Sequence, residues 1–600
     1  MTEMTQTYSD LIKEAFIAPI RNVTVIDDEY PTLLSLIDLQ NRNVAEVTEV
    51  SIASNNANTE RLKKIITMCH STYRWSIDVF DGHSPNFGGD EDVPSHIHHS
   101  DLIVLDYHLD GDASADDGKR ARKIIRSLDE NNHYNLTLVH TKGYEGEIEA
   151  VFTEILKDFI RISPSNPLLP SLEVVEKMQS WLDSNEDGMA YPWISGDINL
   201  LTLFSIYFSP MPEKCINPRR PTHPLNAFLS DINDVATRAG LTSIDLIKWR
   251  FLEILEKNKV TFDHDVRFDL QWHWGEDTNF ISTGKAFISV IRKSADDPED
   301  ELIGSLSEAL TKHNASPMHL LMAKMRYELD EKGIEQASKI ISNRYAQAGW
   351  LYNLLQNANN DSSHDKAINL HWEQLATASR EELRGFSKKI IAAAGTTCPE
   401  DEKKFVKSFF RECMDNKDLA LGHLNAFSCS MPVNNNHLIT GTVLDIDGEK
   451  WVCITPACDM VPDQKIAQWQ SRIGKSYLVF KGMKFDSVNL DTANGKANCN
   501  EYIYLNINGV PEAYWLRSEN PSWDTFYAAK QGCYDDDHTV TLSCVREDAE
   551  ADGMPLVMKS LQAKAVAELR YEYALNLLHK FGSSQTRVGL DFQEKSSMWA

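Results

Sequence analysis

Acidic side chains follow two short apolar runs near the start of the chain. Asp27 and Asp28 come directly after residues 23–26, and Asp106 comes directly after residues 102–105. Short apolar runs of this kind are typical of buried strands, and parallel strands present their carboxyl ends at one edge of a sheet. Carboxylates gathered at such an edge can bind a divalent cation and handle phosphoryl groups.

A third apolar run places a hydroxyl beside these acids. Residues 136–140 form another predicted strand, which ends in Thr141. Two amphipathic helices are predicted on either side of this strand, because apolar residues recur there with i, i+3, i+4, i+7 spacing. Their apolar positions are Ala121, Ile124, Ile125 and Leu128 in the first helix and Ile148, Val151, Phe152, Ile155 and Leu156 in the second.

This arrangement resembles the receiver domain of bacterial response regulators, over residues 1–185 of the chain. The resemblance implies an α/β domain of the flavodoxin-like kind. It also implies that Asp27, Asp28 and Asp106 bind Mg²⁺, that Asp106 is the phosphoacceptor and that Thr141 contacts the phosphoryl group. No enzymatic activity is expected beyond phosphorylation of Asp106.

The last strand departs from the family pattern. The family has a Lys-Pro pair at the end of this strand, whereas residues 158–162 run into Ser163 and Pro164. The phosphate-binding lysine is therefore predicted to be missing. Arg161 and Lys142 are the two cations considered as substitutes, and neither is in the expected register.

Two connections also differ from the family pattern. Residues 82–100 are rich in Gly, Asp and His, and a loop is predicted where the family has a helix. The second strand is expected at residues 75–80, far from the first, so a long helical insertion ending near Cys69 is predicted between them.

The chain is long enough for about three or four domains, because single cores stop growing near 250–300 residues. We predict a receiver-like domain at 1–185, an α-helical domain at 186–420 and an α+β domain at 421–600. The last should contain a small β-barrel or mixed sheet, since short strands rich in β-branched and aromatic residues alternate there with Asp, Gly and Asn. A final helix is predicted from the spacing of Leu561, Ala565, Leu569, Tyr573 and Leu577.

The charge and composition narrow the classes of partner. The chain carries 60 basic and 88 acidic residues, a formal charge of −28, which opposes general binding to nucleic acid. No apolar run is long enough to cross a membrane, and the N-terminus does not have the pattern of a signal peptide, so a cytoplasmic location is expected. Ten cysteines without regular spacing favour reduced thiols.

A second candidate site lies in the C-terminal region. Cys458 follows a predicted strand, stands beside Asp459 and has His423 and His437 upstream, which is compatible with a cysteine nucleophile. A structural turn after Pro456 is the favoured alternative.

The first hypothesis is a cytoplasmic bacterial signalling or regulatory protein with an atypical phospho-receiver. The resemblance implies a two-component-like phosphorelay, or an antiviral defence system, with a sensor histidine kinase or related ATPase and other proteins as partners. Two alternatives stay open. One is an enzyme with an active site near Cys458, and the other is a scaffold with a degenerate receiver.

Overall fold

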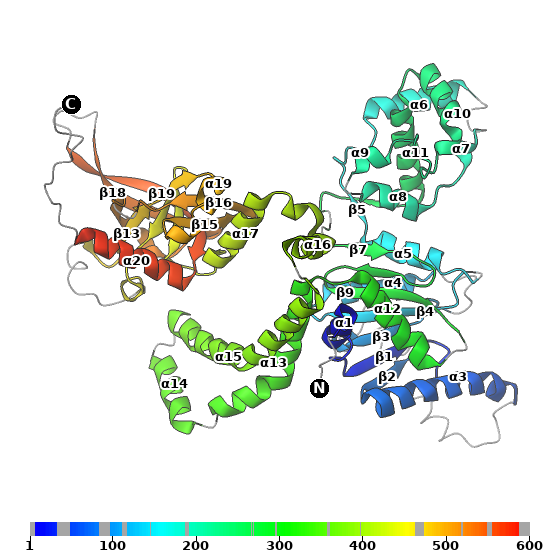
Figure 1. Ribbon diagram of the computed structural model, residues 1–600, viewed down its shortest axis with the longest axis horizontal. Helices are drawn as coiled ribbons and strands as arrows, with labels where there is room; N and C mark the ends of the chain where they lie inside the picture. Colours follow the sequence, from blue (N-terminus) through cyan, green and yellow to red (C-terminus); the bar gives the residue numbers. More distant parts are fainter. Residues whose placement is uncertain are drawn as a thin grey trace. The chain divides into compact units, whose positions relative to one another are not determined.

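The computed structural model shows two compact units (Figure 1). One contains residues 1–340 and 375–393, and the other contains residues 341–374 and 394–600. The structure describes residues 6–32, 49–82, 97–110, 117–144, 146–185, 191–209, 211–265, 267, 269–294, 297–341, 343–356, 361–396, 398–462, 473–517, 520–548 and 555–586.

The first unit is built on a seven-stranded sheet in the order β2-β1-β3-β4-β9-β8-β7. The first five strands of this order run parallel, and β8 and β7 are antiparallel additions at one edge. A parallel 2-1-3-4-5 order is that of doubly wound flavodoxin-like domains, so the predicted α/β class is confirmed. The strands are β1 (Asn22–Ile26), β2 (Ser76–Phe80), β3 (Leu102–Leu105), β4 (Asn135–Thr141), β7 (Gln271–His273), β8 (Phe280–Ser282) and β9 (Ala286–Arg292).

Both faces of this sheet are buried. Successive side chains of β3 point to opposite faces, since Leu102 and Val104 join one apolar cluster whereas Ile103 and Leu105 join the other. Helices α1, α3 and α12 and the start of α13 cover the first face, and α4 and α5 cover the second. Their bounds are α1 (Tyr8–Phe16), α3 (Glu49–Thr67), α4 (Lys119–Glu130), α5 (Glu149–Phe159), α12 (Ser305–His313) and α13 (Pro317–Ile341).

The prediction for the last parallel strand is wrong. Helix α5 continues to Phe159, and within the described residues the short strand β5 (Arg161–Ile162) pairs only with β6 (Thr261–Phe262), in a separate sheet. The place beside β4 belongs to β9, in register from Asn135 opposite Ala286 to Thr141 opposite Arg292. Apolar residues at 159–162 are buried against helices instead of joining the main sheet.

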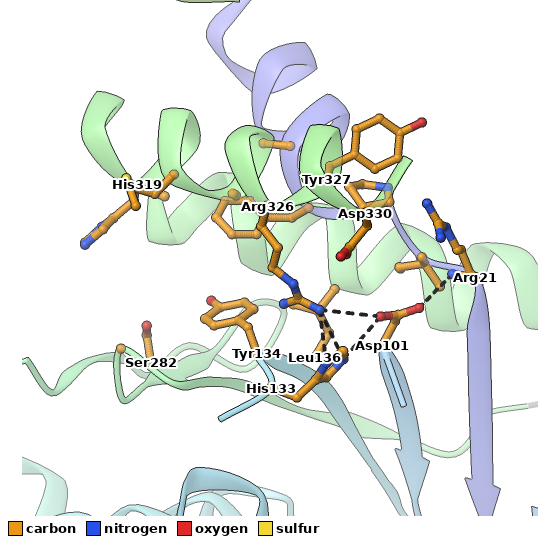
Figure 2. A pocket seen from close by; sticks show the side chains of 18 of the residues that line it. Arg21, Asp101, His133, Tyr134, Leu136, Ser282, His319, Arg326, Tyr327 and Asp330 are labelled. Atoms are coloured by element: carbon orange, nitrogen blue, oxygen red, sulfur yellow. Dashed lines mark hydrogen bonds and ion pairs between the residues drawn. The ribbon is translucent and has the colours of Figure 1, made fainter. Parts of the chain in front are cut away.

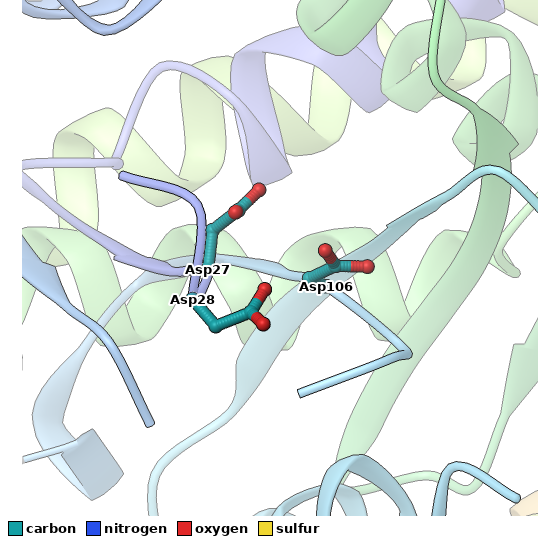
Figure 3. Close-up of side chains that lie close together, drawn as sticks. All are labelled: Asp27, Asp28 and Asp106. Carbon is teal, nitrogen blue, oxygen red and sulfur yellow. The ribbon is translucent and has the colours of Figure 1, made fainter. Parts of the chain in front are cut away.

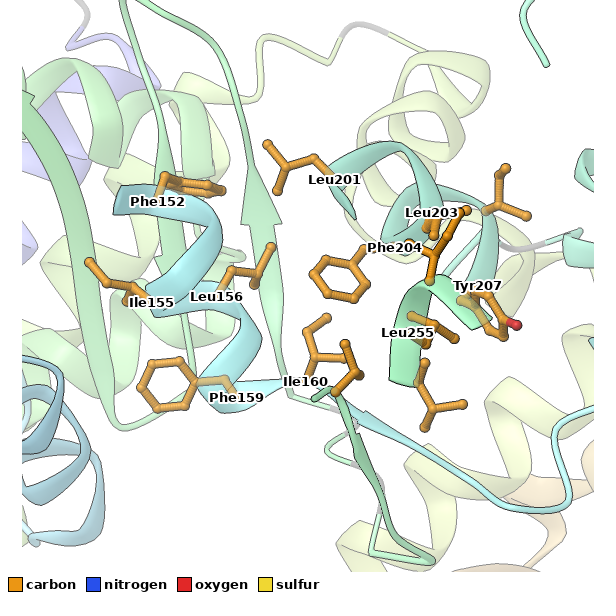
Figure 4. Close-up of a cluster of buried hydrophobic side chains, with 14 of the residues drawn as sticks. Phe152, Ile155, Leu156, Phe159, Ile160, Leu201, Leu203, Phe204, Tyr207 and Leu255 are labelled. Atoms are coloured by element: carbon orange, nitrogen blue, oxygen red, sulfur yellow. The ribbon is translucent and has the colours of Figure 1, made fainter. Parts of the chain in front are cut away.

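The chain between β5 and β6 forms a helical insertion. Its apolar core is continuous with α5, so Phe152, Leu156 and Phe159 belong to the same buried cluster as Phe204 and Leu255 of the insertion (Figure 4). The helices of the insertion are α6 (Leu172–Ser184), α7 (Pro192–Ser195), α8 (Leu200–Tyr207), α9 (Pro212–Cys215), α10 (Leu229–Ala239) and α11 (Ser243–Lys257).

The middle of the chain is mainly helical, as predicted. In the described part of the chain, the α-helices between α13 and the first strand of the second unit are α14 (Arg344–Gln356), α15 (Asp361–Ala393), α16 (Pro399–Phe410) and α17 (Lys417–Cys429). The division at residues 185 and 420 stays a prediction, although β9 of the first sheet comes from the segment assigned to the helical domain. Among the described residues, no helix is both long enough and apolar enough to span a membrane.

The second unit contains the predicted small β-barrel. Strands β11, β12, β13, β17, β18 and β19 each pair antiparallel with the next, and β19 pairs back onto β11, which closes the ring. Their bounds are β11 (Thr442–Ile446), β12 (Glu449–Cys453), β13 (Leu478–Lys484), β17 (Trp523–Ala528), β18 (Thr539–Glu547) and β19 (Leu556–Leu569). The short strand β10 (Ser430–Met431) also pairs with β19, and β14 (Asp486–Val488), β15 (Tyr502–Ile507) and β16 (Val510–Trp515) form a small separate sheet.

The final predicted helix begins later than expected. Residues 556–569 are strand β19, and α20 (Tyr571–Gln585) follows. Ala563, Ala565 and Ala567 are buried, in the period-two alternation of a strand, and β18 pairs with this segment along most of its length. Pairing with two neighbours outweighs the helical tendency of an alanine-rich sequence.

The helical insertion contains a buried histidine, His223. The Nδ1 atom of His223 accepts a hydrogen bond from the backbone N–H of Leu225 at 3.1 Å, and its ring stacks on Phe251. Burial lowers the pKa of His223 to about 4, below the value of about 6.5 for an exposed histidine. The neutral imidazole of His223 therefore contributes its full stability to the insertion above pH 6.5, and this contribution is lost as the pH falls towards 4.

We predict that the insertion loses roughly 3 kcal/mol of stability between pH 7 and pH 4 through this one group. In the variant His223→Asn the amide oxygen can still accept from Leu225 but does not titrate, so that part of the loss should disappear. Hydrogen exchange of peptides from α10 and α11, corrected for intrinsic rates, measures the difference. Equal losses of protection in both proteins would contradict the prediction.

Candidate functional site

The polar residues of the candidate site lie at the carboxyl ends of the parallel strands. Asp27 and Asp28 follow β1, Asp106 follows β3 and Thr141 ends β4. The backbone N–H of Asp106 donates to the carbonyl of Ile26 at 2.8 Å, which extends the pairing of β1 and β3 up to the acids. This edge lies at the switch point between β1 and β3, where open α/β sheets bind ligands.

Three carboxylates converge there (Figure 3). One oxygen atom from each of Asp27, Asp28 and Asp106 lies within 4.8 Å of the others, and Asp27 and Asp106 are buried. Hard oxygen ligands at this spacing fit Mg²⁺, which is commonly bound by one or two carboxylates and several waters. The predicted residues therefore form one cluster whose donor atoms suit the metal.

A lysine completes this cluster. The Nζ atom of Lys293 lies 2.6 Å from Asp106 and 2.9 Å from Asp27, and only 12% of its side chain is exposed. Lys293 directly follows β9, so it reaches the same edge as the acids. The prediction that the site has no lysine is thus wrong, because the strand that carries this lysine comes after the helical insertion.

The net shift is upward for the pKa values of both Asp106 and Lys293, although the causes differ. Burial raises the pKa of Asp106 to about 6, and Asp27 adds to the rise while Lys293 opposes it. For Lys293, burial would lower the pKa, but the charges of Asp106 and Asp27 outweigh it and raise the pKa above its ordinary value. The lysine is therefore a fixed cation that compensates two buried acids.

Thr141 is tied to the lysine through the backbone. Its side chain is fully buried, and its Oγ1 atom accepts a hydrogen bond from the N–H of Gly143 at 3.0 Å. The carbonyl of Thr141 accepts from the N–H of Lys293 at 2.8 Å, which extends the pairing of β4 and β9. The hydroxyl and the ammonium group therefore belong to two segments that are joined by hydrogen bonds.

Comparison with known families assigns this part of the chain. Residues 19–168 match the family model described as a response receiver domain. The N-terminal part of the chain is a receiver domain. No curated protein and no solved structure matches the sequence. The matched residues include β1 to β4 and α5 and end before β9, so Lys293 lies outside them.

The cations considered from the sequence do not enter the receiver site. Lys142 pairs with Glu29 at 2.7 Å on the rim, with 62% of its side chain exposed. Arg161 donates to the carbonyls of Asp158 and Ile160, next to β5. Ser163, expected in the lysine position, instead shares a hydrogen bond with Ser165.

Lys293 has a sequence signal of its own. The run Ala-Phe-Ile-Ser-Val-Ile at residues 286–291 is as strand-like as those that precede the acids, and a lysine stands just beyond its end. The family pattern predicts that the strand with the lysine comes directly after α5. It therefore points to the apolar run at residues 158–162 and not to the run at residues 286–291.

The C-terminal cysteine has different surroundings. Cys458 is exposed, and its thiol donates to the carboxylate of Asp459 at 3.4 Å. His437 is buried next to Asn436, and His423 is exposed on α17. Within the described residues no hydrogen bond joins Cys458 to either histidine.

A separate cavity of about 390 Å³ lies at the amino ends of the strands (Figure 2). Asp101 accepts from the backbone N–H groups of Arg21 and Asn22 and pairs with His133 at 3.2 Å, while Arg326 of α13 contacts His133. These polar groups thus satisfy one another. This cavity is at the opposite end of the strands from Asp106 and takes no part in the receiver site.

The lysine should compete with a metal ion. Lys293 holds Asp27 and Asp106, which a bound Mg²⁺ would share, so removing the ammonium group removes both repulsion and competition. We predict that Lys293→Ala binds Mg²⁺ at least about tenfold more tightly than the wild type, a difference of about 1.4 kcal/mol. Isothermal titration measures the affinity.

The variant Asp28→Asn should bind the metal more weakly than the wild type and serves as the control of opposite sign. Weaker or unchanged binding in Lys293→Ala would show that the lysine does not compete.

Proposed function

We propose that this protein is a signalling or regulatory protein whose receiver domain is phosphorylated on Asp106. The observation that carries the proposal is the contact of Lys293 with Asp106, because it completes a set of acids, cation and hydroxyl at one sheet edge. The residues proposed to hold Mg²⁺ are Asp27, Asp28 and Asp106. When bound there, the metal would neutralise charge that builds on the phosphoryl oxygens.

The remaining chemistry belongs to the side chains. A carboxylate oxygen of Asp106 attacks the phosphorus atom, and the bond from phosphorus to the donor's leaving group breaks as the acyl phosphate forms. Lys293 is the cation next to the accepting oxygen, so its ammonium group can shift from the carboxylate of Asp106 to the phosphoryl oxygens. The hydroxyl of Thr141 would contact the same group after leaving Gly143.

The complete set favours a working site over the alternative of a degenerate scaffold. Two buried acids need a cation for charge balance alone, but the scaffold hypothesis does not account for the third carboxylate and the hydroxyl at the same edge. The surroundings of Cys458 give no comparable support to the enzyme hypothesis, because its thiol contacts only a neighbouring carboxylate among the described residues.

The proposal includes a cytoplasmic location and a protein kinase as the phosphodonor. A sensor histidine kinase or a related ATPase is the partner expected from the receiver domain, and a two-component or antiviral defence system is the expected setting. The barrel and helices of the second unit would then contact further proteins. Co-purification of the chain with a kinase, dependent on Asp106, would support this partner class.

We predict that acetyl phosphate adds about one phosphoryl mass to the wild type in the presence of Mg²⁺, and none to Asp106→Asn. Lys293→Ala should be phosphorylated about a hundredfold more slowly, since it removes a cation aimed at the developing charge. Intact-protein mass spectrometry over time measures both effects.

Ser163→Lys is the matched control. It creates the Lys-Pro pair of the family pattern, but at the end of β5, which is not a strand of the main sheet, so it should neither raise the rate in the wild type nor rescue Lys293→Ala. Rescue by Ser163→Lys would contradict the assignment of the lysine to residue 293. The proposed function itself fails if neither acetyl phosphate nor a cognate kinase modifies Asp106.

A further inference from the structure

A buried carboxylate lies directly behind the receiver site. Glu301, in the short helix η6 (Glu299–Gly304), exposes only 5% of its side chain. Its Oε1 atom accepts from the backbone N–H of Ser294 at 2.8 Å and from Nε2 of His140 at 2.7 Å. Its Oε2 atom forms an ion pair with Arg61 of α3.

Two of these partners, Ser294 and His140, are next in the sequence to Lys293 and Thr141, the two residues proposed to contact the phosphoryl group. Ser294 follows Lys293, and His140 precedes Thr141. Arg61 also donates to the carbonyl of Ser294 at 2.7 Å, so both backbone polar groups of Ser294 are bonded to one ion pair. Glu301 is not one of the clustered metal-ligand candidates among the described residues.

The charges around Glu301 are balanced. Burial, together with the cations Lys293 and Arg61, lowers the pKa of His140 to about 3, so the imidazole is neutral and donates its Nε2–H to the carboxylate. Arg61 then supplies the one positive charge that a buried carboxylate requires. Such an arrangement is specific for a carboxylate, because an amide in the same place would present an N–H group to one of these donors.

We propose that Glu301 is a positioning residue that fixes the backbone beside Lys293, so that the ammonium group can reach both Asp27 and Asp106 before the reaction and the phosphoryl group after it. A lysine has four rotatable side-chain bonds, and holding its backbone reduces the conformational freedom that would otherwise oppose these contacts. The inference rests on the proposed function and identifies what sets the geometry of its cation.

This role predicts a pattern that general damage to the fold would not produce. Glu301→Gln should slow phosphorylation of Asp106 by acetyl phosphate about tenfold, the usual size of an effect exerted through another residue. The same substitution should tighten Mg²⁺ binding, in the direction of Lys293→Ala, because a loosened lysine competes less for Asp27 and Asp106. A distorted site would instead lose both phosphorylation and metal binding.

A double-mutant cycle tests whether Glu301 acts through Lys293. If Glu301 acts through the lysine, Glu301→Gln should cause no further loss of rate in the Lys293→Ala background. Glu299→Gln is the matched control, since Glu299 lies on the same helix and accepts from Tyr73, with no hydrogen bond to Ser294 among the described residues. It should behave like the wild type.

The experiment uses the full chain with acetyl phosphate, with mass spectrometry for phosphorylation and calorimetry for Mg²⁺. Should Glu301→Gln fold poorly, Arg61→Gln tests the same ion pair from the α3 side and should give the same pattern. Multiplying losses in the double variant, or weaker Mg²⁺ binding in Glu301→Gln, would overturn the positioning role.

The possible results distinguish the positioning role of Glu301 from the proposed phosphorylation of Asp106. A wild type that is phosphorylated on Asp106 while Glu301→Gln matches it in rate and metal affinity would overturn the positioning role and leave the function intact. A wild type that never accepts phosphate would overturn the function. The Mg²⁺ arm would then still decide whether Glu301 holds the lysine over the acids.

Discussion

The pairing of β4 with β9 is the contact on which the receiver site depends. It joins Thr141 to Arg292 across the sheet and so delivers Lys293 to the acids at the ends of β1 and β3. The two strands are separated in the chain by the whole helical insertion. Because the entropy of closing a loop grows only slowly with its length, and because the insertion packs on α5 in one continuous apolar core, the fold tolerates such a separation.

Charge balance explains why a lysine is needed at this edge of the sheet. Asp27 and Asp106 are both buried, and two like charges at this distance would repel each other strongly in a low-dielectric setting. Lys293 contacts both, and a second ion pair, between buried Glu301 and partly buried Arg61, lies next to it. At the carboxyl edge of the sheet, each buried acid therefore lies next to a cation, and backbone hydrogen bonds hold these residues in place.

Local patterns were sufficient to predict the acids but not the cation. Each of Asp27, Asp106 and Thr141 directly follows an apolar run, so strand periodicity and the rule for parallel sheets place them together. Lys293 also follows such a run, but which strand lies beside β4 depends on pairing between distant segments. The alanine-rich strand β19 shows the same limit, because its partners β11 and β18, and not its own propensity, determine its conformation.

The insertion changes what the receiver fold presents to its surroundings. Helix α5 begins shortly after Thr141 and buries Phe152 and Phe159 in the core that it shares with the insertion (Figure 4). A close-packed core transmits displacement, because its side chains have little free space. A displacement of α5 would therefore also displace the side chains of the insertion that pack on it. The same polypeptide segment that separates Lys293 from the other site residues thus packs on the helix that follows Thr141.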